Sequence, residues 1–231
     1  MKSKIIYLSL IINCALWGQE QQMNCATTLL INQNVNNFKV FKYPKNYKSL
    51  KLNGFDEVTN TTPENLLSSV ISASNLDWYN FNNEGKKEKT NQDFEAIKKT
   101  DSKDYFLELL YKVHFQANGS EYAIVKYYLH DKNKELLGYA DAMKKMDNKW
   151  VIISETEVSQ LMFFMIMIDT KYIDAIFNNK ESDNITLNKI IIANRVNNSI
   201  NLNNVLNELE EKLSSNNTTF KQIMDPYRLF K

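Results

Sequence analysis

Residues 105–154 read YFLELLYKVHFQANGSEYAIVKYYLHDKNKELLGYADAMKKMDNKWVIIS, and this stretch decides the fold. It holds four runs rich in strand-forming residues, separated by turn signals at 118–120, 131–135 and 147–148. Strands joined by such short turns pair in antiparallel fashion. The stretch therefore predicts an antiparallel meander of four strands. The expected strands cover residues 105–117, 121–130, 136–146 and 149–156.

The first hairpin of this meander has a register that depends on the length of its loop. Odd positions of the first strand are all apolar or aromatic, which is the pattern of a strand with one buried face. A three-residue loop, Asn118-Gly119-Ser120, places Phe115 opposite Ala123 and brings the apolar residues of both strands to that face. A two-residue loop instead places Lys112 opposite Val125, so we expect the three-residue register.

The later strands show how the sheet is expected to pack. Gly138, Ala140 and Ala142 share one face, which indicates close approach of a helix or a concave bend. Residues 150–153 are consecutively apolar, which is typical of a strand that is buried on both faces. The last strand is therefore expected to be buried on both of its faces.

Helices are expected before the meander. Thr62-Pro63-Glu64 combines an N-cap residue, a proline at the first helical position and an acid in the first turn, and predicts a helix that runs to about Tyr79. Residues 92–99 predict a second, short helix. Earlier still, residues 38–52 alternate weakly, and because Pro44 interrupts them they are expected to form an edge strand. A leading helix followed by an antiparallel meander belongs to the α+β class.

These elements also resemble a known superfamily. The segments PENLLSSVISA at 63–73 and DWY at 77–79, with the ending YADAMKKMDNKWVI at 139–152, are similar to the NTF2-like (SnoaL-like, cystatin-like) superfamily over about residues 62–154. The resemblance implies a cone-shaped fold in which N-terminal helices pack on a curved sheet around a pocket. The superfamily includes small enzymes, ligand binders and interaction modules, so the resemblance implies no particular activity.

The last third of the chain is expected to add an extension of helix, strand and helix, packed on this core. Residues 158–168 are strongly apolar but too short to span a membrane, and this run by itself fits a buried helix or a buried strand. The helical spacing of apolar residues over 170–180 favours a helix. Residues 186–196 predict a strand, and residues 201–214 predict an amphipathic helix. The tail from residue 216 is expected to be partly disordered.

The amino terminus has the layout of a secretory signal peptide. Lys2 and Lys4 precede an apolar run over 5–17, and Gly18 is a small residue suited to cleavage. We therefore expect an exported protein, periplasmic or secreted, with lipid attachment at Cys14 as the alternative. The expected organisation is a signal peptide at 1–18, a lead and edge strand at 19–61, the α+β domain at 62–156, an extension at 157–215 and a tail at 216–231.

Charge and composition argue against several classes of function. The net charge is +1, and without the leader the chain holds 26 basic and 27 acidic side chains, so neither nucleic acid nor an anionic membrane is expected as the main partner. Without the leader, Cys25 is the one remaining cysteine, so no internal disulfide is expected. The sequence contains no CxxC or HExxH spacing and two histidines, so neither a metal nor a cofactor is predicted.

A few polar and aromatic side chains of the meander are candidates for a site. Asp141 shares its strand face with apolar residues and is the first candidate for an acid–base role, unless it pairs with Lys126. In the expected register Glu108 lies opposite His130, either as a surface ion pair or as an acid–base dyad. Aromatic residues are expected to line the core and a pocket. The candidate ligand-binding residues are Tyr111, Tyr127, Tyr139 and Trp78.

The leading hypothesis is a non-enzymatic exported protein that binds a small apolar ligand or another envelope protein. It rests on the expected signal peptide, the aromatic meander and the lack of a catalytic motif. One alternative is a SnoaL-like enzyme that uses Asp141 for acid–base chemistry in an aromatic-lined pocket. Another is a homodimeric structural module of the cell envelope, joined through the sheet face that carries Leu110, Ile124 and Tyr128.

Overall fold

A computed structural model of the chain describes most residues from Asn36 onward. The expected signal peptide, with Cys14, and the segment that contains Cys25 lie outside the described residues, so export stays a prediction. The described residues are 36–83, 89–98, 105–117, 119–131, 136–153, 156–178, 180–196, 199–200, 204–205, 208–209, 211–212 and 220–228.

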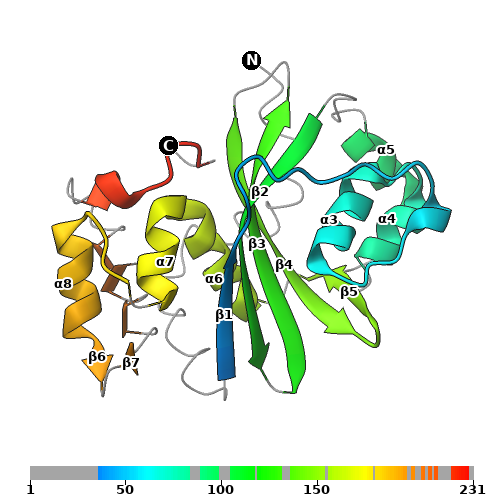
Figure 1. The fold of residues 1–231 in the computed structure, drawn as a ribbon. Helices are drawn as coiled ribbons and strands as arrows, with labels where there is room; N and C mark the ends of the chain where they lie inside the picture. Colours follow the sequence, from blue (N-terminus) through cyan, green and yellow to red (C-terminus); the bar gives the residue numbers. More distant parts are fainter. Residues whose placement is uncertain are drawn as a thin grey trace.

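A five-stranded antiparallel sheet lies at the centre of the molecule, in the order β1-β2-β3-β4-β5 (Figure 1). β1 is an edge strand, as predicted, but it begins before the expected range of 38–52 and ends before Pro44. β2 to β5 form the predicted meander, and β5 ends earlier than expected because a helix begins at Thr156. The strands are β1 (Asn36–Lys42), β2 (Tyr105–Ala117), β3 (Ser120–Asp131), β4 (Leu137–Met146) and β5 (Lys149–Ile152).

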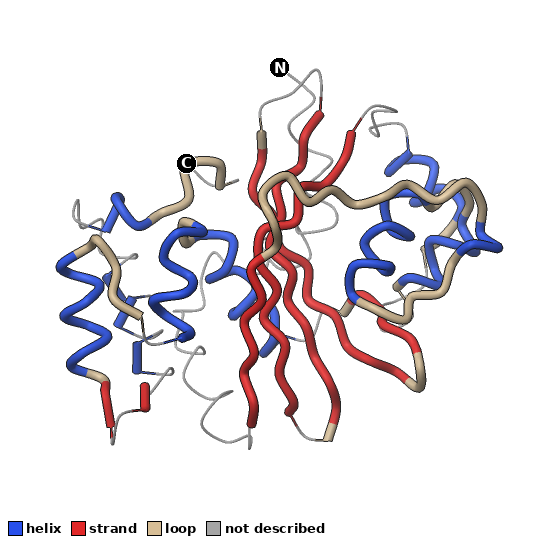
Figure 2. Tube along the Cα trace, in the orientation of Figure 1, coloured by secondary structure: helices blue, strands red, loops and turns tan. Residues whose placement is uncertain are grey.

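Helices cover both faces of this sheet (Figure 1, Figure 2). The helices that precede the meander lie on one side, and those that follow it lie on the other. The arrangement has three layers and confirms the predicted α+β class. The first set is α3 (Pro63–Ser72), α4 (Leu76–Asn82) and α5 (Asn91–Lys98), and the second set is α6 (Thr156–Met167), α7 (Thr170–Asn178) and α8 (Ile185–Ala193).

Capping residues explain where the first helices begin. The Thr62 side chain accepts a hydrogen bond from the backbone N–H of Asn65 at 3.1 Å, which confirms the predicted start of α3. The prediction of one continuous helix is wrong, because α3 ends at Ser72. The Asn75 side chain accepts a hydrogen bond from the backbone N–H of Trp78 at 2.9 Å and so starts a second helix, α4.

The β2–β3 hairpin has a two-residue loop, so the predicted three-residue register is wrong. Lys112 lies opposite Val125, as the shorter loop requires. Gly119 has a backbone φ of 75°, the left-handed conformation that tight hairpin turns use. A β-bulge then shifts the register between Leu109 and Tyr111, so that Leu109 lies opposite Tyr127 and Leu107 opposite Leu129.

Because of this bulge, the apolar residues at the odd positions of β2 are buried on both faces of the sheet. Before it, Leu107 and Leu109 pack in the cluster that contains the buried residues of α3. After it, Tyr111 and Val113 pack in the cluster that contains α6 and α7. The prediction of a strand with a single buried face is therefore wrong, because the extra residue inverts the alternation of side chains.

The second sheet face is covered by the chain's own C-terminal helices. Ala140 and Ala142 of β4 pack with Met165 of α6, which confirms the close approach predicted from small residues. Ile124 is fully buried in the same cluster. The sheet face expected to join a homodimer is therefore occupied, and that choice of dimer surface is wrong.

The extension is helical where a strand was predicted over residues 186–196. α8 occupies most of that range, and its N-cap residue Asn184 accepts a hydrogen bond from the backbone N–H of Leu187 at 2.9 Å. Leu187, Ile190 and Ile191 are buried, so helix packing outweighs the strand propensity of isoleucine. Within the described residues, no helix has the length and hydropathy needed to cross a bilayer.

Beyond α8 the chain returns to the sheet. Residues 204–205, 208–209 and 211–212 are helical, in agreement with the helix predicted over 201–214. The partly disordered tail expected from residue 216 contains a defined segment at 220–228, whose Ile223 is buried in the cluster with α6 and α7. The short elements here are β6 (Arg195–Val196), β7 (Ser199–Ile200) and the 3-10 helix η2 (Phe220–Ile223).

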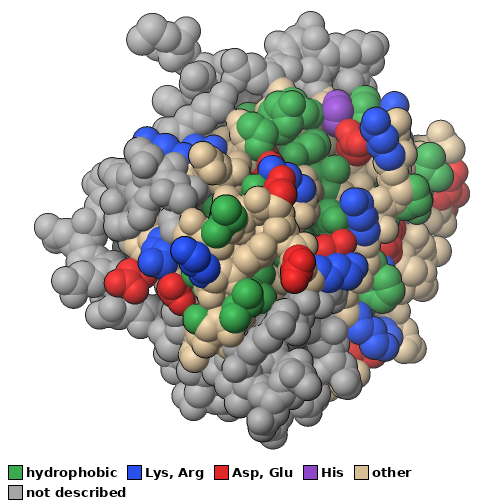
Figure 3. Space-filling view, turned by 60° about the vertical axis from the view of Figure 1, so that its left-hand side comes forward, with side chains coloured by type: hydrophobic (Ala, Val, Ile, Leu, Met, Phe, Trp, Pro, Cys, Tyr) green, Lys and Arg blue, Asp and Glu red, His purple; other side chains and the backbone are tan. Residues whose placement is uncertain are grey.

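The surface on the side of the C-terminal helices is mixed in charge. Figure 3 shows acidic and basic side chains interspersed with hydrophobic ones on this face. Two ion pairs of the C-terminal helices are well exposed: Lys171 with Asp183 at 3.4 Å, and Lys180 with Asp174 at 3.6 Å. Exposed pairs of this kind contribute at most about 1 kcal/mol each.

Candidate functional site

The main candidate site is a carboxyl group beside two tyrosines, on the sheet face that α3 covers. Asp141 Oδ2 accepts a hydrogen bond from the Tyr127 hydroxyl at 2.7 Å. The rings of Tyr127 and Tyr139 stack with centroids 6.0 Å apart. Asp141 is half-buried, whereas both tyrosines are buried. We call these three residues the Asp141 site; all three are sequence candidates that the fold brings together.

Strand register explains why these side chains share one face. Asp141 lies opposite Val125, and Tyr139 lies opposite Tyr127. Because side chains alternate along a strand and opposite residues point the same way, all four side chains face the side of the sheet that α3 covers. The neighbouring residue Lys126 points to the other side of the sheet. The alternative in which Asp141 pairs with Lys126 is therefore wrong.

The Tyr127 hydroxyl acts as a permanent hydrogen-bond donor to Asp141. Burial first, and the nearby Asp141 carboxylate second, raise the pKa of Tyr127 well above its usual value of 10.0. Tyr127 therefore stays protonated at neutral pH and holds the carboxyl group in one orientation. A carboxyl group held in this way can accept a hydrogen bond from an amine or a hydroxyl of a ligand, or exchange a proton with it.

The other two candidate ligand-binding residues lie elsewhere. Tyr111 belongs to the cluster on the opposite face of the sheet. Trp78 belongs to a separate cluster with residues of α4 and α5, where its indole N–H donates a hydrogen bond to Ser69 Oγ at 2.6 Å. Ser69 in turn donates to Asn82 Oδ1 at 2.7 Å. Trp78 therefore anchors a buried polar network, and the four predicted residues do not share one pocket.

Glu108 and His130 form a pair on the sheet face opposite to Asp141. Glu108 Oε2 lies 2.8 Å from His130 Nε2, but the pair is diagonal, because Phe106 rather than Glu108 lies opposite His130. The His130 ring stacks on Phe106 with centroids 4.5 Å apart, and Lys48 Nζ lies 4.1 Å from the centre of the Phe106 ring. The sheet separates this cluster from Asp141, so the two cannot act on the same reacting atoms.

The deepest charges of the described structure are a pair that the sequence did not predict. Lys126 and Asp225 have fully buried side chains, and Nζ lies 2.6 Å from Oδ2. Lys126 also donates to the backbone carbonyl of Ile168, just after α6. Burial lowers the pKa of Lys126, and the attraction of Asp225 opposes this effect. No local signal links the two residues, because Asp225 lies in the expected tail.

A second half-buried carboxylate joins α3 to the edge of the sheet. Glu64 Oε1 accepts a hydrogen bond from Lys112 Nζ at 2.6 Å and another from the Tyr43 hydroxyl. Burial raises the pKa of Glu64, but these hydrogen bonds outweigh it and leave the pKa below its usual value of 4.5. Both donors already bind Glu64, so this cluster serves to fasten α3 to β2 and to the segment after β1.

Metal ligation and similarity to known proteins add no further site. Within the described ranges, no group of three or more His, Cys, Asp or Glu side chains is placed to hold a metal ion. Comparisons of the chain with protein-family models, with curated proteins and with solved structures find no match. The function is therefore inferred from the geometry of the chain's own residues.

Proposed function

We propose that the protein is an exported, non-enzymatic binding module with an NTF2-like core, and that it binds a small, mostly apolar ligand at the Asp141 site. The expected signal peptide and the resemblance over residues 62–154 support export and the type of core. The apolar cluster around the Asp141 site supports the ligand class. Such a ligand would present an amine or a hydroxyl to Asp141 and apolar carbon to the tyrosine rings.

The observation that carries this proposal is the hydrogen bond from Tyr127 to Asp141. Placing a carboxyl group on an apolar face costs free energy, so a residue that served packing alone would be apolar here. The hydrogen bond from the Tyr127 hydroxyl to Asp141 Oδ2, with a length of 2.7 Å, fixes the orientation of the carboxyl group. Fixed polar groups in apolar surroundings are what ligand pockets use to orient a bound molecule.

Native mass spectrometry of the exported protein tests the proposal. Asp141→Asn keeps an oxygen that can accept from Tyr127 but removes the negative charge. We expect a ligand to co-purify with the natural protein and its occupancy to fall by at least about tenfold in D141N, since a charge-assisted hydrogen bond is lost. Asp147→Asn is the matched control, because Asp147 lies in an exposed turn with φ of 52°, which asparagine also adopts.

The proposal fails if no ligand accompanies the natural protein, or if D141N and D147N carry it equally. The same spectra separate the two alternatives. An enzyme that uses Asp141 would carry a chemically altered molecule in the natural protein and the unreacted one in D141N. A homodimeric module would show the mass of two chains in every variant, joined through a surface other than the covered sheet face.

A further inference from the structure

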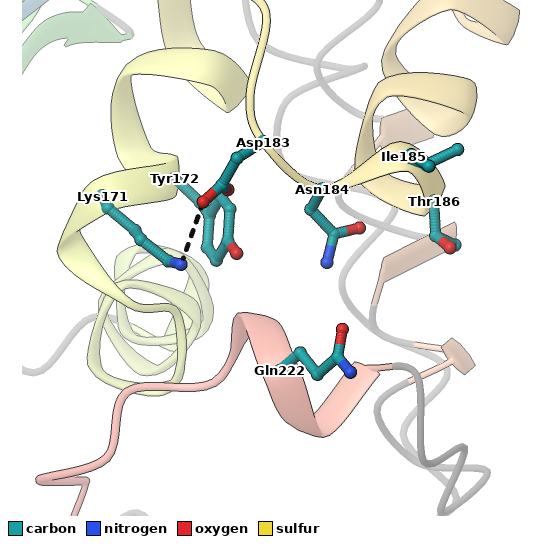
Figure 4. A pocket seen from close by; sticks show the side chains of 7 residues that line it. All are labelled: Lys171, Tyr172, Asp183, Asn184, Ile185, Thr186 and Gln222. Atoms are coloured by element: carbon teal, nitrogen blue, oxygen red, sulfur yellow. Dashed lines mark hydrogen bonds and ion pairs between the residues drawn. The ribbon is translucent and has the colours of Figure 1, made fainter.

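A hollow of about 500 Å³ lies among the C-terminal segments (Figure 4). α7 and α8 lie on the side of the sheet opposite α3, so the hollow is separate from the Asp141 site (Figure 1). Three parts of the chain form it: the start of α7, the start of α8 with the residues before it, and η2. The lining includes donors from side chains and backbone, beside acceptors and one aliphatic side chain. No local sequence pattern brings these segments together.

One wall of the hollow is a lysine. Lys171 Nζ lies 3.4 Å from Asp183 Oδ2 and 4.6 Å from the centre of the Tyr172 ring. Contact with the Tyr172 hydroxyl first, and then with Asp183, raises the pKa of Lys171. The Lys171 and Asp183 side chains are 52% and 71% exposed, so their attraction is weak. An anion in the hollow can therefore compete with Asp183 for the ammonium group.

The opposite wall is a buried amide whose donor points into the hollow. Asn184 is 8% exposed, and its Oδ1 accepts the backbone N–H of Leu187 at 2.9 Å. Because this bond fixes the oxygen, the amide nitrogen points the other way, toward the space between Tyr172 and Gln222 (Figure 4). This nitrogen donates no hydrogen bond to any residue in the described part of the chain. It is available to an acceptor from a ligand.

Two backbone groups add to these donors. Ile185 and Thr186 are the first residues of α8, and both line the hollow. The first N–H groups of a helix have no partner within it, and the Asn184 cap takes only that of Leu187. The positive end of the α8 dipole also lies at this point.

We propose that this hollow binds the carboxylate or phosphate group of a small molecule. The oxyanion would lie between Lys171 and Asn184 and accept from the ammonium group, the amide nitrogen and the first N–H groups of α8. Among the described residues that line the hollow, Asp183 is the one acid, and it already pairs with Lys171. The volume of about 500 Å³ exceeds the size of a bare ion, so the hollow has room for further atoms beside the oxyanion.

Calorimetric titration of the full chain with inorganic phosphate and with acetate tests this site. Asn184→Asp is the decisive variant, because aspartate keeps the helix cap but replaces the donor with an acidic oxygen. We expect millimolar binding by the natural protein and at least about tenfold weaker binding by N184D, since a donor becomes a repelling charge. Asp183→Asn should tighten binding severalfold, because it removes the competitor for Lys171.

Two lysine variants, one inside the hollow and one outside it as a control, test the role of positive charge in anion binding. Lys171→Met should weaken binding by about tenfold. Lys180→Met removes an exposed lysine that pairs with Asp174 and does not line the hollow, so it should leave binding unchanged.

Preference for phosphate or for acetate assigns the class of ligand. The proposal is overturned if neither ion shows saturable binding to the natural protein, or if N184D binds as tightly as the natural protein. Weaker binding of the ions by D183N than by the natural protein, the opposite of the expected change, overturns the proposal as well. D141N should bind both ions normally, so a failure at this hollow is distinct from a failure of the Asp141 site.

Discussion

The buried pair of Lys126 and Asp225 gives a sharp test of how the C-terminal segment is held on the sheet. Lys126→Met keeps much of the side-chain length and removes the charge and its donors. It leaves the Asp225 carboxylate in the interior, where its remaining donors in the described structure are the Tyr227 N–H at 2.8 Å and the Tyr128 hydroxyl at 3.4 Å. Neither of these groups carries a positive charge.

The expected cost is large because both side chains are fully buried. Removing one partner of such a pair lowers the free energy of unfolding by about 3–5 kcal/mol, a large part of the roughly 5–15 kcal/mol of a typical domain. Asp225→Asn leaves the Lys126 ammonium with the Ile168 carbonyl and should cost a similar amount. The double variant K126M/D225N should be more stable than the sum of the single losses predicts, by about 2 kcal/mol, because no charge is left alone.

Urea unfolding followed by tryptophan fluorescence measures these free energies. Lys180→Met is the matched control, since its partner Asp174 lies at 3.6 Å and the two side chains are 61% and 30% exposed. That variant should lose at most about 1 kcal/mol. Amide hydrogen exchange adds a local measurement, because the Gly138 N–H donates to the Tyr227 carbonyl at 2.7 Å and should lose protection in K126M.

Two results would refute this reasoning. A loss below about 1 kcal/mol in K126M would mean that water reaches the pair in solution, so that burial does not set its energy. Additive losses in the double variant would mean that the two side chains stabilise the protein independently rather than through their mutual contact.

Three further predictions concern the sheet and its helices. Burial lowers the pKa of His114 below its usual value of 6.5, against the opposing effect of Glu121. The unfolded chain therefore binds the proton more readily than the folded chain, and the free energy of unfolding should fall as pH drops below about 6.5. His114→Gln should flatten this fall, as measured by urea unfolding at several pH values. Gly119→Ala should cost about 1 kcal/mol in the same assay because φ is 75°, and a neutral result would contradict the two-residue loop. Ser69→Ala should cost about 1–3 kcal/mol, since the buried Trp78 N–H loses its acceptor at 2.6 Å, whereas the exposed Ser74→Ala should be near neutral.

The strands of the meander were predictable because their signals are local. Alternating side chains and turn residues act over a few positions, and the bounds of β2 that they predict, Tyr105–Ala117, are those of the structure. The bulge between Leu109 and Tyr111 was not predictable from the same pattern. A bulge moves the side chains that follow it to the other face of the sheet without any change in residue type. Apolar residues at every odd position are therefore compatible with one buried face or with two.

The error at α8 has a different cause. The run of isoleucines at 190–192 favours a strand by intrinsic propensity. Packing of Leu187, Ile190 and Ile191 and the cap at Asn184 favour a helix instead, and the packing depends on parts of the chain that are distant in sequence. The cap itself was a readable signal, since asparagine precedes the apolar run at N-cap spacing.

By itself, the sequence determined the α+β class, the order of the strands and the start of the first helix, because periodicity, turns and caps act between near neighbours. It also supplied Asp141 as a candidate, since an acid among apolar residues on a strand is visible in the pattern. Only the tertiary structure decided that Asp141 meets Tyr127 and that Lys126 meets Asp225. The first contact depends on the register between β3 and β4, where one residue of slip changes the face, and the second depends on a tail that returns from far along the chain.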